Sequence, residues 1–323
     1  MRSVVEAHES WSESTAMGTV VHVCLVTAGA ADGDTLANAA SAAHGIVAEV
    51  DAALSRFVPT SDLSRLNAAP GRWLPVGPHL VAVAQAAEHY RTRTSGIFDA
   101  TGVGPPAQHR IRWREGDDGW EAWLAPGHVA DFGAIAKGYA ADLARERCRA
   151  AAAGVLVSIG TSSISFAGVA PRRAVWRIAI GSPWEELTET VGYVETPCGS
   201  FSMSGVRGHR LGAASLVVEH VLDPRTGRSA RTDVCAVGVL SDDGMRSEAL
   251  STATLVLGLR EGMALCRALG AEALVLTASG AVVATPEMAP RVALREGVSE
   301  WACRRGRSAQ STPAAARLGA NGS

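Results

Sequence analysis

Asp131–Gly154 reads DFGAIAKGYAADLARERCRAAAAG, and this stretch decides the fold class. It predicts a glycine-containing loop that runs into a helix, which Gly154 ends because glycine readily takes the left-handed conformation beyond a helix. Apolar runs follow and predict strands over Val155–Ile159, Ser163–Phe166, Trp176–Ile180 and Val234–Val239. Strands in runs, with helices only at intervals, predict an α+β fold rather than a doubly wound parallel sheet.

Further helices and strands are predicted on both sides of this stretch. Apolar residues at helical spacing predict a helix over Thr35–Leu54, and a second helix is expected over about Pro78–Thr94. Ser55–Trp73, between them, is rich in Ser, Asp, Asn, Pro and Gly and is expected to form turns. The other predicted elements are a strand at Thr19–Val26, helices at about Met245–Leu257 and Arg260–Leu269, and strands at Ala273–Thr277 and Ala281–Thr285.

Composition indicates a compact enzyme. The chain has 323 residues, of which 47% are hydrophobic, and this is enough for a large core. A formal net charge of −2 supplies no field that gathers nucleic acid or an anionic membrane, so we expect neither partner. The six cysteines are scattered without a CxxC pair, which favours buried reduced thiols over a zinc site or a disulfide framework.

The chain ends set the expected domain boundaries. The opening MRSVVEAHESWSESTAMG carries Glu and Ser where a signal peptide needs an apolar run, and no segment approaches the roughly 18 apolar residues of a membrane span. We therefore expect a cytoplasmic protein. Residues 1–16 are expected to be a flexible N-terminus, residues 17–302 one domain, and residues 303–323 a disordered tail, because the tail has little apolar bulk.

A carboxylate and a hydroxyl share one face of a predicted helix. In SEALSTATLVLG (Ser247–Gly258), Glu248 and Thr252 are four residues apart. Both are hard oxygen ligands, which Mg²⁺ accepts when phosphate oxygens complete its shell. The alternative is an exposed glutamate near a helix N-terminus that only favours the helix dipole.

Two further clusters combine polar groups with turns. In DFGAIAKG, Gly133 and Lys137 at the start of a helix suit an anionic ligand, unless the lysine is simply solvated. In HVLDPRTGRSARTD (His220–Asp233), Asp223–Gly227 predicts a type I turn. The turn leaves His220 unexplained, so this histidine is either a structural residue or one near its ordinary pKa and available as a base.

Three widespread signatures are absent from the sequence: a GxGxxG that opens a helix, a Walker loop and a GxSxG elbow. The clusters that are present, in their order along the chain, resemble the ApbE-type FAD:protein FMN transferases, also called flavin transferases. The resemblance covers most of the chain, from Met17 to about Thr285. Its pieces are MGT (Met17–Thr19), LSRF and SDLSRLNAAPG from Leu54, SGIFDATGVGP from Ser95, DFGAIAKGYAAD from Asp131, VSIG ending at Gly160, MSG (Met203–Gly205), HVLDPRTGR from His220 and SEALSTATLVLG from Ser247.

The resemblance implies an α+β fold with T-fold-like repeats of antiparallel strands and packed helices, in a single large domain with a deep FAD cleft. It implies a Mg²⁺-dependent transferase that moves FMN from FAD to a Ser or Thr hydroxyl of a partner protein and releases AMP. The positions that match the family's FAD contacts are Met17, Phe57, Ile97, Phe98, Asp99, Asp131, Lys137, Leu222 and Ser251. Those that match its metal ligands are Ala134, through its backbone carbonyl, Glu248 and Thr252.

Individual roles follow from the same resemblance. Asp99 and Asp131 are expected to accept hydrogen bonds from the ligand's sugar or base, and Met17, Phe57 and Phe98 to flank a ring. His220 is the expected general base for the incoming hydroxyl. Asp223 either orients that histidine or only forms the turn.

The chain departs from the family pattern at three places near this site. Glu248 replaces an aspartate and is one methylene longer; Gly160-Thr161 replaces Gly-Gly; and Met203-Ser204-Gly205 replaces Thr-Ser-Gly. Three functions therefore stay open. The chain is a flavin transferase that acts on a partner protein, a diverged enzyme that uses a small-molecule acceptor or hydrolyses FAD to FMN and AMP, or a non-catalytic FAD-binding protein.

Overall fold

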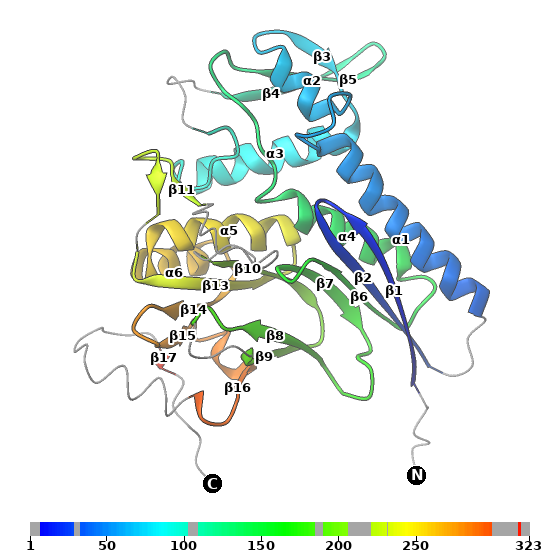
Figure 1. Ribbon diagram of the computed structural model, residues 1–323, viewed down its shortest axis with the longest axis vertical. Coiled ribbons are helices and arrows are strands. Elements are labelled where there is room, and N and C mark those ends of the chain that lie inside the picture. The colour runs from blue at the N-terminus through cyan, green and yellow to red at the C-terminus, as the bar shows by residue number, and fades with distance from the viewer. Residues whose placement is uncertain are drawn as a thin grey trace, which may run out of the picture.

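A nine-stranded sheet forms the centre of the computed structural model of this chain (Figure 1). The structure describes residues 7–28, 33–102, 109–184, 190–205, 221–230, 232–298 and 316–317. The strand order is β1-β2-β6-β7-β10-β13-β14-β15-β17, and neighbours pair antiparallel. The strands are β1 (Ala7–Ala16), β2 (Thr19–Ala28), β6 (Gly154–Ile159), β7 (Ser163–Gly168), β10 (Gly199–Gly205), β13 (Val234–Ser241), β14 (Glu272–Thr277), β15 (Val282–Ala284) and β17 (Ala316–Arg317).

Helices cover one face of this sheet, and a small sheet covers part of the other (Figure 1). The covering helices are α1 (Gly33–Leu54), α4 (Ala136–Cys148), α5 (Gly244–Leu257) and α6 (Leu259–Ala268). The small sheet has the order β16-β9-β8 and consists of β8 (Trp176–Gly181), β9 (Thr190–Thr196) and β16 (Val292–Leu294). A 3-10 turn at Ala289–Arg291 comes directly before β16.

A second helix-and-sheet group lies at the end of the molecule beyond α1 and α5 (Figure 1). It consists of α2 (Asp62–Ala68), α3 (Pro78–Arg93) and the sheet β3-β5-β4, formed by β3 (Trp73–Pro75), β4 (Ile111–Gly116) and β5 (Gly119–Leu124). A separate hairpin pairs β11 (Leu222–Asp223) with β12 (Arg228–Ser229).

Strand β2 is largely apolar from Val20 to Val26, apart from His22, because both of its faces are covered. Val21, Val23 and Leu25 pack with the helices, whereas Cys24 and Val26 pack in the cluster that holds the small sheet. Successive side chains of a strand point to opposite faces, so a strand covered on both sides needs a continuous apolar run. This is the pattern that predicts a strand at Thr19–Val26.

The α+β prediction is confirmed, and most predicted elements are present within a few residues of their expected ends. The helices expected at 35–54, 78–94, 245–257 and 260–269 are α1, α3, α5 and α6. Among the described helices, none combines the length and the apolar character that crossing a bilayer requires.

The expected end of the helix after Asp131 is wrong. Helix α4 ends at Cys148, six residues before Gly154, and Gly154 begins strand β6 instead. A Cβ on Gly154 would lie 1.8 Å from the carbonyl oxygen of Val169. This glycine therefore permits a close approach of two chain segments, not a helix cap.

Both expected chain-end segments also differ in part from the structure. Residues 7–16, assigned above to a flexible N-terminus, form β1, which pairs with β2 along its whole length. Met17 and Gly18 form a two-residue turn with φ of +52° and +70°, which suits a tight hairpin. In the tail, Ala316–Arg317 pairs with β15, and the rest of 299–323 lies outside the described residues.

The turn-rich segment Ser55–Trp73 contains a short helix that the sequence pattern conceals. The hydroxyl of Ser61 accepts a hydrogen bond from the backbone N–H of Ser64 and caps α2. Leu63 and Leu66 are three residues apart and buried. Burial of these two leucines and the cap stabilise a helix too short for a periodicity argument to detect.

Candidate functional site

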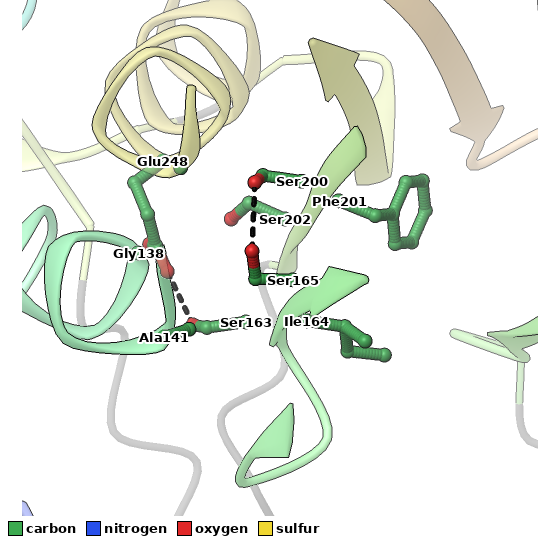
Figure 2. Close-up of a pocket in the computed structure, with 10 residues that line it drawn as sticks. Gly138, Ala141, Ser163, Ile164, Ser165, Ser200, Phe201, Ser202 and Glu248 are labelled. Atoms are coloured by element: carbon green, nitrogen blue, oxygen red, sulfur yellow. Dashed lines mark hydrogen bonds between the residues drawn. The ribbon is translucent and has the colours of Figure 1, made fainter. Parts of the chain in front are cut away.

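Glu248 lines a small pocket between α4, α5, β7 and β10. Figure 2 shows its side chain extending from α5 to Ser163 at the start of β7. The carboxylate accepts a hydrogen bond from the Ser163 hydroxyl through Oε1. Glu248 is 5% exposed and forms no ion pair with a cationic side chain in the described part of the chain. A buried carboxylate in this state favours binding a cation, because burial of an unpaired charge is costly.

Thr252 follows Glu248 by one helical turn and belongs to a group of hydroxyls. Its Oγ1 lies 3.4 Å from the hydroxyl of Ser204, which lies 2.8 Å from the hydroxyl of Ser251. Ser251 is fully buried and also donates to the carbonyl of Glu248. Ser251 thus makes its hydrogen bonds within the protein, and its contact with FAD stays a prediction. Thr252 is half-buried beside Glu248.

The Ala134 carbonyl lies in the loop that leads into α4. Among the described residues, no hydrogen bond ends on this oxygen, although its neighbour Gly133 accepts one from Lys137 Nζ at 2.9 Å. A carboxylate, a hydroxyl and a backbone carbonyl are the all-oxygen donors that Mg²⁺ prefers. The residues that match the family's metal ligands therefore fit such an ion. No group of three or more His, Cys, Asp or Glu suited to a metal occurs in the described ranges.

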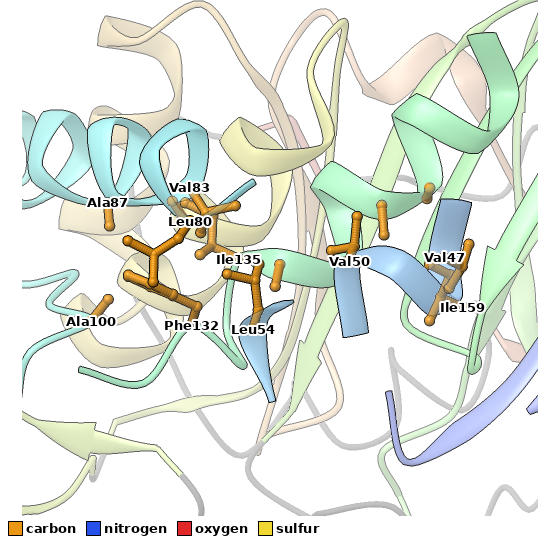
Figure 3. Packing of buried hydrophobic residues seen from close by; sticks show 14 of the residues in the cluster. Val47, Val50, Leu54, Leu80, Val83, Ala87, Ala100, Phe132, Ile135 and Ile159 are labelled. Atoms are coloured by element: carbon orange, nitrogen blue, oxygen red, sulfur yellow. The ribbon is translucent and has the colours of Figure 1, made fainter. Parts of the chain in front are cut away.

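The loop after α3 is fastened by apolar side chains. Figure 3 shows Ala100 and Phe132 in the same packed layer as Leu80 of α3. Ile97 and Phe98 belong to this cluster and are only 8% and 2% exposed. The expectation that Phe98 flanks a ligand ring stays a prediction. Its side chain fills the core and holds the loop in place.

The Asp99 side chain forms its hydrogen bonds and its ion pair with groups in or beside the same loop. Its Oδ1 accepts hydrogen bonds from the backbone N–H and the hydroxyl of Thr101, and its Oδ2 is paired with Arg110. Arg110 also donates to the carbonyl of Gly102 at 2.8 Å. The Asp99 side chain is 3% exposed, so it orients Arg110 rather than presenting a free carboxylate to a ligand.

A cavity of about 240 Å³ opens beside this ion pair. The loop of 95–102 and the β11–β12 hairpin form its sides, with Ser95, Gly96, Asp99, Gly102, Arg110, Pro224 and Arg225 as lining residues. Ser95 has φ of +53°, an unusual conformation for a residue other than glycine. The cavity brings together two of the segments that the sequence resemblance assigns to FAD.

Asp131 and Phe57 meet at the surface. Asp131 forms an ion pair with Arg56 at 2.7 Å, and its Oδ1 accepts from Gly133 N. The Arg56 guanidinium lies 4.8 Å from the centre of the Phe57 ring, which is 80% exposed. Phe57 is exposed, and its role in flanking a ring stays a prediction. The backbone N–H of Asp131 donates to Ala100 and joins this surface to the Asp99 loop.

Met17 lies at the hairpin turn between β1 and β2. Its backbone N–H donates to Asp51 Oδ2 at 2.7 Å and fastens the turn to α1. Gly160 lies nearby with φ of +64°, and its ideal Cβ would lie 3.0 Å from the Thr19 hydroxyl. Thr161 is not among the described non-glycine residues with positive φ. Threonine at this family glycine position is therefore not strained.

The two expected catalytic residues differ in what the structure shows. His220 lies outside the described residues, and its role as a base stays a prediction. Asp223 accepts hydrogen bonds from the side chain and backbone of Arg225 and, through its carbonyl, from Gly227. The Arg225 side chain is the main cause of a pKa of Asp223 below its ordinary value. These contacts favour the turn-forming role. Leu222, beside it, is 54% exposed.

Three residues that sequence reasoning missed shape the site. Asp142 accepts hydrogen bonds from Ser165 and Ser200 and from the backbone N–H of Gly244, the first residue of α5. Ser163 holds Glu248, and Arg110 pairs with Asp99. Asp142 lies in the quoted DFGAIAKGYAAD motif, so its place there was a usable signal. Ser163 carries no such signal because its partner, Glu248, is 85 positions away in the sequence. The residues around Arg110 likewise form no pattern that points to Asp99.

Among the described residues, no cysteine lines the Glu248 pocket or the cavity beside Arg110, and Cys303 lies outside the described residues. Cys24, Cys148 and Cys266 are buried free thiols, as expected, whereas Cys198 is exposed, so the prediction of uniform burial is wrong. Burial raises the pKa of Cys24 to about 12 and the pKa of Cys148 to about 11. Such thiols are protonated and unreactive at neutral pH.

A model of the ApbE family matches residues 17–122 and 106–275. A Rhodobacter capsulatus FAD:protein FMN transferase is 34% identical over 174 residues, which cover 53% of this chain and 32% of that protein. A Vibrio cholerae FAD:protein FMN transferase is 25% identical over 279 residues, covering 78% and 82%. The chain thus spans about a third of the first relative and most of the second.

Solved structures have the same fold. The ApbE protein of Thermotoga maritima superposes with a TM-score of 0.74 at 21% identity, over 90% of this chain and 100% of that one. The apo form of the Pseudomonas stutzeri flavinyl transferase ApbE gives 0.73 at 25% identity, over 89% and 98%. The α+β architecture predicted from sequence is therefore shared with both.

Proposed function

Because this chain belongs to the ApbE family, we propose that it is a Mg²⁺-dependent FAD:protein FMN transferase. In this reaction a Ser or Thr hydroxyl of a partner protein bonds to the phosphorus of the FMN half of FAD. The bond from that phosphorus to the AMP half breaks, AMP leaves, and the hydroxyl proton passes to a base. The relatives named above carry this activity in their names.

The observation that carries the proposal is the buried Glu248 carboxylate without a cationic partner. It lies one helical turn from Thr252, and the Ala134 carbonyl is unbonded within the described residues. These three groups would hold Mg²⁺, which when bound supplies charge neutralisation for the phosphoryl oxygens and for departing AMP.

The chain's own residues supply the rest of the chemistry. Exposed Phe57 and the cavity beside Arg110 are suited to the two ends of a dinucleotide. Lys137 is held at the start of α4, where its ammonium group favours anionic ligand groups. His220 is the proposed base, and the β11–β12 hairpin follows it directly in sequence.

The test is incubation with FAD and Mg²⁺, with and without an acceptor peptide that contains Thr, followed by mass spectrometry and AMP analysis. FMN bound covalently to the peptide supports the proposal. AMP without labelled peptide indicates hydrolysis or a small-molecule acceptor, and intact FAD bound without turnover indicates a binding protein. Glu248→Gln should abolish transfer, whereas Glu261→Gln, an exposed change on α6, should not.

The place of this reaction in the cell is part of the proposal. We propose that the acceptor is a cytoplasmic protein. Cell fractionation followed by detection of the flavin-labelled acceptor checks it.

A further inference from the structure

Glu248 is held by a hydroxyl on a different element. The Glu248 carboxylate on α5 reaches Ser163 on β7. Ser163 is 1% exposed and lies 85 positions away in sequence. Within the described chain, this hydroxyl is the hydrogen-bond donor to the Glu248 carboxylate, and Oε2 accepts no bond.

The surroundings restrict both partners. A Cβ on Gly138 would lie 2.9 Å from Glu248 Cγ, so the glutamate side chain passes closely over the backbone of α4. Ser163 lies in a strand between two neighbours, where its Cα pairs with Ile159 of β6 and Ser202 of β10. The hydroxyl is therefore fixed by the sheet, whereas the glutamate has one more rotatable bond than an aspartate.

A ligating carboxylate binds a cation well only when its orientation is set beforehand. Hydrogen bonds from residues behind the ligands supply that orientation, and their loss typically lowers metal affinity about 10–100-fold. A glutamate without such a bond would have to be ordered when the cation binds. The bond from Ser163 to Oε1 orients the carboxylate without a cation, and Oε2 accepts no hydrogen bond within the described residues.

We propose that Ser163 is a positioning residue that sets the orientation of the Glu248 carboxylate, so that cation affinity depends on the Ser163 hydroxyl. The inference rests on the proposed function for the presence of Mg²⁺ at Glu248. The dependence is specific to the longer side chain, because an aspartate at 248 would end one methylene short of Ser163.

A double-mutant cycle tests the proposal. Mg²⁺ is titrated calorimetrically into wild type, Ser163→Ala, Glu248→Asp and the double variant, alone and with ADP as a diphosphate-bearing fragment. Ser163→Ala should weaken Mg²⁺ binding about 10–100-fold when residue 248 is Glu and leave it unchanged when residue 248 is Asp. Ser163→Thr should keep wild-type affinity because it keeps the hydroxyl.

Controls separate positioning from folding. Ser158→Ala, in the neighbouring strand β6, removes a hydroxyl that bonds Gly160 and not Glu248, and it should leave affinity unchanged. Thermal unfolding of each apo variant shows that the fold is intact. Equal affinity in wild type and Ser163→Ala, additive effects in the cycle, or no Mg²⁺ binding by wild type would each overturn the proposal.

The outcome is independent of the test of function. FMN transfer by wild type, together with unchanged Mg²⁺ affinity in Ser163→Ala, removes the role of Ser163 and leaves the proposed activity. If Mg²⁺ affinity depends on both Ser163 and Glu248 but wild type does not transfer FMN, the role of Ser163 stands and the proposed activity is removed.

Discussion

Gly138 and Gly244 bring the backbones of α4 and α5 into direct contact. A Cβ on Gly138 would lie 2.3 Å from the carbonyl oxygen of Gly244, and a Cβ on Gly244 would lie 2.4 Å from that of Gly138. Neither position accepts a side chain. This crossing places Glu248, one turn further along α5, against α4.

Gly138→Ala should lower the free energy of unfolding by about 1–3 kcal/mol, because the methyl group pushes two backbones apart. Urea denaturation measures the change. The control is Gly45→Ala in the middle of α1, where a Cβ meets nothing within 4 Å. That change should stabilise by about 0.5–1 kcal/mol. Equal stability of the two variants would contradict the close crossing.

Arg110→Met should destabilise the protein by about 3–5 kcal/mol, because it leaves the buried Asp99 carboxylate without its cation. Arg114→Met removes an ion pair with Glu121 in which the arginine is 53% exposed, and it should change stability by about 0–1 kcal/mol. Chemical denaturation of both variants checks the difference. A loss no larger in Arg110→Met than in Arg114→Met would show that Asp99 is not held in this way.

Asp142→Ala should destabilise α5 at its first residue. The change leaves Gly244 N–H without its acceptor and removes the partner of Ser165 and Ser200. Each unsatisfied buried group costs about 1–3 kcal/mol. Amide hydrogen exchange should show faster exchange at Gly244, whereas Asp242→Ala, an exposed change, should not alter it. Unchanged protection of Gly244 in Asp142→Ala would rule out this cap.

His44 should make stability depend on pH. Its ring nitrogens contact the hydroxyls of Ser12 and Ser14 at 2.9 and 2.7 Å, which joins β1 to α1. Burial, followed by the charge of His22, lowers its pKa below the ordinary value of 6.5. The unfolded chain then binds the proton at a higher pH, so stability should fall as the pH drops through 6.5.

His44→Gln should flatten this dependence in urea denaturation at a series of pH values, because glutamine does not titrate. His89→Gln, at an exposed position of α3, is the matched control. A slope that is the same in wild type and His44→Gln would assign the dependence to other groups.

His220→Ala should lower the FMN-transfer rate about 10²–10⁴-fold, the usual contribution of a general base. FAD affinity, measured by flavin fluorescence, should change little. His89→Ala should transfer at the wild-type rate. If His220→Ala does as well, the base is a different residue.

Local patterns in the sequence predict the helices and strands that have a clear apolar pattern, but not those that lack one. The apolar spacing of α1 and the continuous run of β2 depend on neighbours along the chain, so both were predictable. Strand β1 was missed because AHESWSESTA is a polar edge strand whose alternation is weak. Helix α2 was missed because it depends on one cap and two buried leucines.

Local spacing also predicts one part of the candidate site, whereas packing between distant segments decides another. Motif order placed Glu248 and Thr252 on one helix face, and the structure confirms this because α-helical spacing is a local property. The burial of Phe98 was not predictable, since whether an aromatic ring faces a ligand or the core depends on which helices cover it.

The sequence by itself determined the fold class, the family and the residue types available for a cation and a dinucleotide. Only the tertiary structure decided what each side chain contacts. The Glu248 carboxylate and the Ser163 hydroxyl are 85 positions apart, and they meet because Gly138 and Gly244 let two helices touch over the sheet. Contacts of this kind depend on close packing between distant segments, and no spacing within one segment encodes them.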